Sequence, residues 1–149
     1  MAKYTAMDVA NWFTKWADFN GADLSNMKLQ KLLYYAQGHY LAFFGEPLFE
    51  EELEAWSHGP VVPSVYRAFK DNGSGDIPPT PDFDLSNIDP DTTQFLQKIW
   101  NTYGGIAAWK LRDMTHGEDP WVAHFVDDER NIVIPKDSLR RWFKSTAKK

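Results

Sequence analysis

The residues of this chain best suited to catalysis or metal binding are its histidines, because the sequence contains no cysteine. His58 and His116, together with Asp113, are of the types that bind zinc and similar metals. If the fold brings these three side chains together, they would form a metal-dependent hydrolytic site. None stands at a ligand spacing such as HExxH, so this remains the alternative hypothesis, and structural roles are favoured for both histidines.

Nucleophilic catalysis is not indicated by any pattern in the sequence. Ser57 and His58 are adjacent, and adjacent side chains are expected to diverge rather than pair as nucleophile and base. There is no GxSxG elbow and no phosphate-binding glycine loop. His58, Gly59 and Pro60 instead suggest a stiff turn in which His58 bonds a backbone carbonyl or a helix end. We therefore predict no catalytic residue, no resident metal, no cofactor and no enzymatic activity.

The elements that must position these side chains are predicted to be mainly helical, with a small two- or three-stranded sheet. Thr5 and Asp8 resemble a capping box that opens a helix over residues 5–18. Further helices are expected at residues 92–103, 107–114 and 120–125, followed by a last helix capped by Asp137 or Ser138. Residues 131–134 form a short strand that can pair with residues 51–56.

The central helix is predicted over residues 25–44, between the capping Ser25 and Gly45. Its inward face is expected to be Leu29, Leu32, Leu33, Ala36, Tyr40 and Phe43. Further apolar residues widen this arc beyond a surface stripe, so the helix should pack against several neighbours. Gln30 and Gln37 must then form hydrogen bonds if they are buried.

A long acidic segment interrupts the helices. Residues 71–92 are rich in proline and glycine and contain six aspartates but no lysine or arginine. A loop of this length is uncommon within a compact domain. The two interpretations are a solvated connector, which we favour, and a docking strip for a basic partner.

The bulk composition narrows the possible classes of protein. The 149 residues suit one domain, the net charge is −5, and no apolar stretch is long enough to span a membrane. The N-terminus lacks the apolar core of a signal peptide, and the absence of cysteine fits a cytoplasmic location. The basic C-terminus resembles no DNA-binding module, so a nucleic-acid partner is not expected.

Three segments resemble one known family. They are SNMKLQKLLYYAQG at residues 25–38, AWSHGPVVPSVY at residues 55–66 and THGEDPW at residues 115–121. Their order and spacing are similar to those of the Panacea domain, also called SocA-like and phage-associated. The likeness extends over nearly the whole chain, and residues 1–149 would form one such domain. The motif residues it singles out are His58, Gly59, Pro60, Thr115, His116, Pro120 and Trp121.

The resemblance implies an antitoxin of a type II-like toxin–antitoxin system. Such a protein neutralises its cognate toxin by direct binding, and one branch of the family acts as a proteolytic adaptor for a ClpXP-type protease. A phage regulatory protein with a non-toxin partner is a further alternative. From the residues, Thr115 or Asp119 is expected to cap the short helix that Pro120 opens, and Trp121 to anchor that helix in the core.

Candidate contact residues for the partner lie off the predicted inward stripe of the central helix and on the helix after HGPVVP. Aromatic and basic side chains on an exposed face are suited to protein recognition, since tyrosine brings area and a hydroxyl at low entropic cost. The candidates are Lys28, Lys31, Tyr35, Tyr66 and Arg67, together with the acidic loop.

Overall fold

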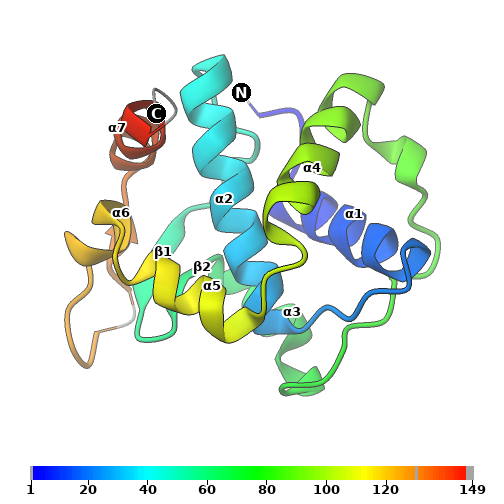
Figure 1. Cartoon of the computed structure of the whole chain (residues 1–149), viewed down its shortest axis with the longest axis horizontal. Helices are drawn as coiled ribbons and strands as arrows, with labels where there is room; N and C mark the ends of the chain where they lie inside the picture. Colours follow the sequence, from blue (N-terminus) through cyan, green and yellow to red (C-terminus); the bar gives the residue numbers. More distant parts are fainter. Residues whose placement is uncertain (1, 130, 147–149) are drawn as a thin grey trace.

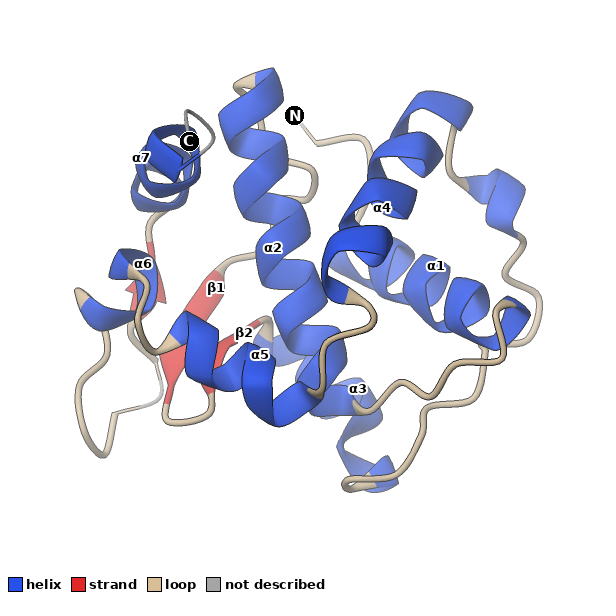
Figure 2. Cartoon of the chain, in the orientation of Figure 1, coloured by secondary structure: helices blue, strands red, loops and turns tan. Residues whose placement is uncertain are grey.

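The computed structural model describes residues 2–129 and 131–146. Within them the chain forms seven α-helices, two 3-10 turns and one three-stranded sheet, which confirms the predicted mainly helical class (Figures 1 and 2). The elements are α1 (Ala6–Phe19), α2 (Asn26–Phe44), β1 (Leu53–Trp56), β2 (Gly59–Val61), α3 (Pro63–Phe69), η1 (Lys70–Asn72), η2 (Leu85–Asn87), α4 (Pro90–Tyr103), α5 (Ala108–Thr115), α6 (Asp119–Val122), β3 (Val133–Ile134) and α7 (Lys136–Thr146).

Helix α2 is the centre of the fold, and the other helices are arranged around it (Figure 1). Its first turn is capped by the Ser25 side chain, which accepts from the Lys28 amide, and it ends at Gly45 in the left-handed conformation. Side chains on nearly all its sides are buried, as its wide apolar arc predicts. Phe43, expected to face inward, is instead 80% exposed, because it borders an open groove between α2 and α4.

The two glutamines of α2 are buried and fully used, as predicted. Gln30 accepts from the Val62 amide at 2.9 Å and donates to Asn26 at 2.9 Å. Gln37 donates to the Phe49 carbonyl and accepts from the Leu48 amide. These bonds attach to α2 the segment that precedes β1 and the segment that follows β2. They also satisfy the two buried amides, which would be costly without partners.

The sheet is antiparallel with strand order β2-β1-β3. Leu53 lies opposite Ile134, which confirms the predicted pairing of the two segments. The tight turn is formed by Ser57 and His58, whereas Gly59 and Pro60 already belong to β2. The prediction of a turn at residues 58–60 was therefore placed one position too late.

The acidic segment after α3 is attached to the core at three points. Ile77, Phe83 and Ile88 are buried, while the acidic side chains between them are mostly exposed. Asp89 then caps α4, accepting from the Thr92 amide at 2.9 Å. The segment therefore includes short 3-10 turns and apolar anchors in place of the continuous loop that was expected.

Several helix ends differ from the prediction in detail. Helix α7 starts at Lys136, so Asp137 lies inside its first turn and is not the cap. Helix α6 begins after Glu118, and no side chain caps it. The Thr115 hydroxyl instead donates to the Arg112 carbonyl, so neither predicted cap of α6 is correct. Among the described helices, none combines the length and apolarity needed to cross a membrane.

Candidate functional site

Lys31 is the point at which the three sequence segments meet. Its side chain is 0% exposed, and its Nζ donates to the Pro60 carbonyl at 3.3 Å. The expectation that the Lys31 side chain is exposed is therefore wrong. The error arises because helices and the sheet surround this part of α2, so a position off the apolar stripe is still enclosed.

Gly59 allows the strand to approach Lys31 this closely. Its φ is +111°, a conformation that side-chain-bearing residues rarely adopt. A Cβ at this position would lie 2.7 Å from the Lys31 Cε and 2.8 Å from the Thr115 Oγ1. The motif residues Gly59 and Thr115 thus enclose the end of the lysine side chain, one from the sheet and one from α5.

The charge on Lys31 has no counterion in the described part of the chain. The ion pairs found there do not include it, and Arg112, whose charge acts on it, is also positive. Burial, reinforced by Arg112, lowers the pKa of Lys31 to about 7. A buried amine with one long hydrogen bond is costly to the fold, which makes this residue unusual.

Tyr35 is also enclosed rather than available to a partner, being 1% exposed. Its hydroxyl donates to Glu118 at 3.0 Å, and that of Tyr34 donates to the same carboxylate at 2.7 Å. Burial raises the pKa of Glu118, and the two tyrosine hydroxyls oppose this effect by stabilising the carboxylate. This group attaches the start of α6 to α2, and the expectation of an exposed Tyr35 is wrong.

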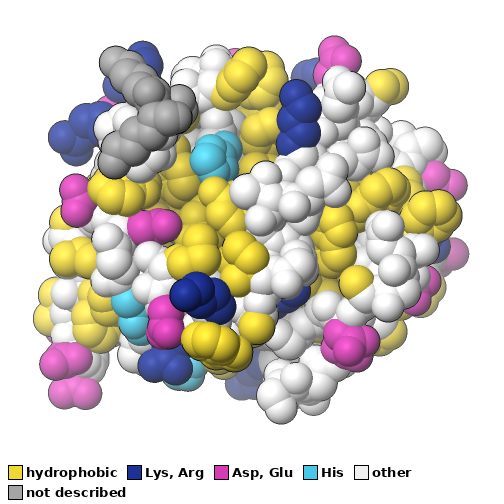
Figure 3. Space-filling model, viewed as in Figure 1, with side chains coloured by type: hydrophobic (Ala, Val, Ile, Leu, Met, Phe, Trp, Pro, Cys, Tyr) yellow, Lys and Arg dark blue, Asp and Glu magenta, His cyan; other side chains and the backbone are white. Residues whose placement is uncertain are grey.

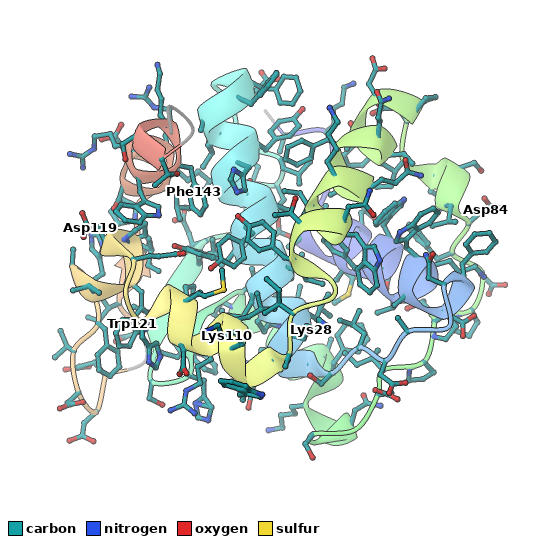
Figure 4. All side chains as sticks on the ribbon, in the orientation of Figure 1. Lys28, Asp84, Lys110, Asp119, Trp121 and Phe143 are labelled. Atoms are coloured by element: carbon teal, nitrogen blue, oxygen red, sulfur yellow. The ribbon has the colours of Figure 1, made fainter. Side chains whose placement is uncertain are left out.

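His116 and Trp121 form a stacked layer beside the sheet. Their ring centroids lie 4.1 Å apart, and Phe125 stacks on the far side of Trp121 at 4.5 Å. The Trp121 indole donates to the Trp56 carbonyl at 2.7 Å, so this half-buried ring anchors α6 on β1 (Figure 4). Pro120 lies in the first turn of α6, as predicted, and its side chain is buried.

The alternative metal site does not form. No group of three or more His, Cys, Asp or Glu side chains among the described residues is arranged to hold a metal ion. His58 and Asp113 are both exposed, and burial lowers the pKa of the half-buried His116. The Ser57 hydroxyl does lie 3.1 Å from the His58 Nδ1, contrary to the expected divergence of the two side chains. His58, Asp113 and His116 therefore do not form the metal site of a hydrolase.

A pocket of about 490 Å³ opens at the N-terminal end of α2, where α2, α3 and α5 meet. We call it the Lys31 pocket. Its lining residues are Ser25, Asn26, Met27, Gln30, Lys31, Trp56, His58, Val61, Tyr66, Lys70, Gly73, Ser74, Ala108 and Trp109. The described part of the lining thus combines aromatic and apolar surface with three groups that can be cationic, and it includes no carboxylate.

The predicted contact residues relate to this pocket in different ways. Tyr66 lines it and packs edge-to-face on Trp56 with centroids 5.0 Å apart. Lys28 is half-buried nearby on α2, and Arg67 is exposed on α3, but neither is in the lining (Figure 4). Trp109, which sequence reasoning missed, lines the pocket and is 64% exposed. The sequence feature that could have identified Trp109 was a large aromatic residue in the first turn of a short predicted helix.

Apolar and basic side chains adjoin each other on the surface over α5 (Figure 3). A second groove, of about 550 Å³, lies between the C-terminal half of α2 and α4, and it includes the exposed Phe43 and Phe44. It contains none of the motif residues. The Lys31 pocket is therefore the better candidate site, because parts of two motif segments line it and the third closes around its lysine.

Comparison with known proteins identifies the family to which these three segments belong. The family described as "Antitoxin SocA-like, Panacea domain" matches residues 29–122. A relative named "Antitoxin SocA", from Caulobacter vibrioides (strain NA1000 / CB15N), is 35% identical over 134 residues, covering 78% of this chain and 68% of the relative. The chain belongs to the SocA-like antitoxin family with a Panacea domain. No solved structure matches it significantly.

Proposed function

We propose that this protein neutralises a cognate toxin by binding it directly, with the face around the Lys31 pocket as the contact surface. The observation that carries the proposal is that two of the family-like segments line this pocket and the third lies close to its lysine, in a chain whose relative is named as an antitoxin. The partner is the toxin of a type II-like system.

The physical character of the pocket supports a protein contact. Exposed Trp109 and half-buried Tyr66 present large aromatic surfaces, the residue types that dominate binding hot spots. The pocket is concave and rests on rigid elements, α2 and the sheet, so little order would have to be gained on binding. Lys28 and Arg67 would then contribute at the rim.

Neutralisation would proceed without catalysis by this chain. Among the described residues, the three proposed hydrolytic residues form no group that could hold a metal ion. His116 stacks on Trp121, and the Thr115 hydroxyl donates to the Arg112 carbonyl. After binding, the protein either blocks the toxin or presents it to a ClpXP-type protease. We place this activity in the cytoplasm and assign it to a single domain formed by residues 1–149, with no cofactor and no nucleic-acid partner.

The test is co-expression with the product of the neighbouring gene, followed by affinity purification. Growth is expected to be restored, and the two proteins should co-purify in a fixed ratio. Repeating the assay in a host without ClpXP separates the two routes, because blocking persists there whereas delivery to the protease does not. A gene product that is toxic alone and stays toxic in the presence of this protein refutes the antitoxin role, and co-purification of a harmless protein favours a regulatory partner instead.

A further inference from the structure

The chemistry of the Lys31 pocket suggests which group of the partner it receives. Among the described residues, its lining offers Lys31, Lys70 and His58 but no aspartate or glutamate, in a chain whose net charge is −5. An acid-free, amine-bearing pocket in an acidic protein is complementary to an anion.

Lys31 itself is not explained by packing. Its ammonium can donate three hydrogen bonds, and the only one formed within the described residues is the 3.3 Å contact with Pro60. An apolar side chain of similar length, such as methionine, would fill the same space without the cost of a buried amine. The amine therefore has spare donor capacity, and Lys31 is one of the residues that line the pocket.

The walls of the pocket are suited to an apolar neighbour of that anion. Trp56 and Tyr66 pack edge-to-face, and Trp109 extends the aromatic surface towards solvent. A volume of about 490 Å³ accommodates one or two side chains of a polypeptide.

We propose that the Lys31 pocket binds a carboxylate of the toxin chain together with an adjacent bulky apolar side chain, and that the carboxylate pairs with Lys31. This inference rests on the proposed function, since it assigns the contact to the toxin. Either an acidic side chain or a chain terminus supplies the same chemistry, and the two are separated by the choice of probes.

The experiment titrates the purified full chain with two matched pairs of small probes, following the Trp56 and Trp109 indole signals by NMR. One pair is N-acetyl-Glu-Phe-amide and N-acetyl-Gln-Phe-amide, and the other is N-acetylphenylalanine and its amide. In at least one pair, the carboxylate is expected to bind about tenfold more tightly than its neutral counterpart, because a charge-assisted hydrogen bond replaces a neutral one. The pair that discriminates identifies the source of the carboxylate.

Two variants locate the effect. Lys31→Met should abolish the preference for the carboxylate probe while leaving the apolar contact. Trp109→Ala should weaken the binding of both probes of a pair. Phe19→Ala removes an equally exposed aromatic side chain at the end of α1 and should change neither. Because Trp109 is exposed, its variant keeps the test valid if Lys31→Met fails to fold.

Three results overturn the proposal: equal binding of carboxylate and amide, no binding of any probe, or stronger binding of adenosine monophosphate, which would indicate a nucleotide site. If the wild-type chain neutralises its toxin and Lys31→Met does so equally well, this inference fails while the proposed function stands. If the wild-type chain does not neutralise the toxin but still prefers the carboxylate probe, the function fails and the carboxylate site of the pocket remains.

Discussion

At the scale of single residues, the most informative feature is the lysine enclosed by the fold. Lys31 is buried against Gly59, Pro60 and Thr115, and the charges that face it belong to Arg112 and to His116 when protonated. Its pKa of about 7 compares with 10.5 for an exposed lysine. Because the unfolded chain binds the proton more tightly over this interval, the lysine makes folding stability depend on pH.

Stability is therefore expected to rise with pH between about pH 7.5 and 9.5, by up to about 1.4 kcal/mol per pH unit from this group. His116 is neutral in this range because its pKa is lowered. Urea unfolding of the wild type and of Lys31→Met at several pH values measures the difference between their slopes. The exposed Lys98→Met on α4 serves as the control and should keep the wild-type slope. Parallel curves of stability against pH for wild type and Lys31→Met would contradict the lowered pKa of Lys31.

Gly59 is expected to tolerate substitution much less well than other glycines with positive φ. In Gly59→Ala, backbone strain of about 1–2 kcal/mol adds to an overlap with Lys31 and Thr115, costing about 1–3 kcal/mol more. Gly45→Ala provides the matched control, because its φ is +76° but nothing lies within 4 Å of the added Cβ. Thermal unfolding compares the two, and equal losses would show that the close approach is unimportant.

At the scale of secondary-structure elements, helix boundaries were predictable wherever a local cap sets them. Thr5 and Asp8 form the expected capping box, and Ser25 with Gly45 bounds α2. The caps of α6 and α7 were misjudged, because residues distant in sequence fix those helices. Glu118, for example, is held by the tyrosines of α2 rather than serving the helix amides.

The exposed and buried faces of α2 were less predictable than its length. A helical period of 3.6 residues distinguishes two faces, but α2 is covered on most sides, so Lys31 and Tyr35 are buried. Phe43 shows the opposite error, since it borders an open groove between α2 and α4. These outcomes depend on where α5 and α7 pack, which a local pattern does not contain.

The contact between α2 and α7 depends on Gly38. A Cβ there would overlap the Phe143 ring, so the small residue lets the two helices approach closely. An alanine inside a helix normally stabilises by about 0.5–1 kcal/mol relative to glycine. Here Gly38→Ala is expected to destabilise by about 1–3 kcal/mol, because the overlap forces α7 outwards.

Chemical denaturation of Gly38→Ala, Phe143→Leu and the double variant checks this expectation. The smaller leucine should restore part of the stability lost in Gly38→Ala, giving a coupling between the two positions. Additive losses of stability in the double variant would mean that the packing of α2 against α7 does not depend on the close contact between Gly38 and Phe143.

At the scale of the whole molecule, the candidate site could be predicted only in part. The motif residues were identifiable along the chain, and Tyr66, which was chosen as a contact candidate, lines the pocket. Trp109 and Lys70 were missed, because they join the pocket only when α5 and the end of α3 pack beside α2. Whether His58, Asp113 and His116 could hold a metal ion likewise depended on tertiary structure, and no such group is found among the described residues.

The central claim is that the face around the Lys31 pocket binds the toxin. Trp109→Ala is the most direct probe of this face, because the side chain is exposed and its loss should change stability by less than about 0.5 kcal/mol. The corresponding control is Phe19→Ala, which removes an aromatic side chain that is 74% exposed and lies outside the pocket.

The decisive measurement is the affinity of wild type, Trp109→Ala and Phe19→Ala for the co-purified toxin, determined by titration calorimetry. We predict that Trp109→Ala weakens binding by about thirtyfold or more, as expected for a hot-spot aromatic residue, while Phe19→Ala binds as wild type does. Unchanged affinity in Trp109→Ala, with a loss in Phe19→Ala or in neither variant, would contradict the account and place the toxin on another face.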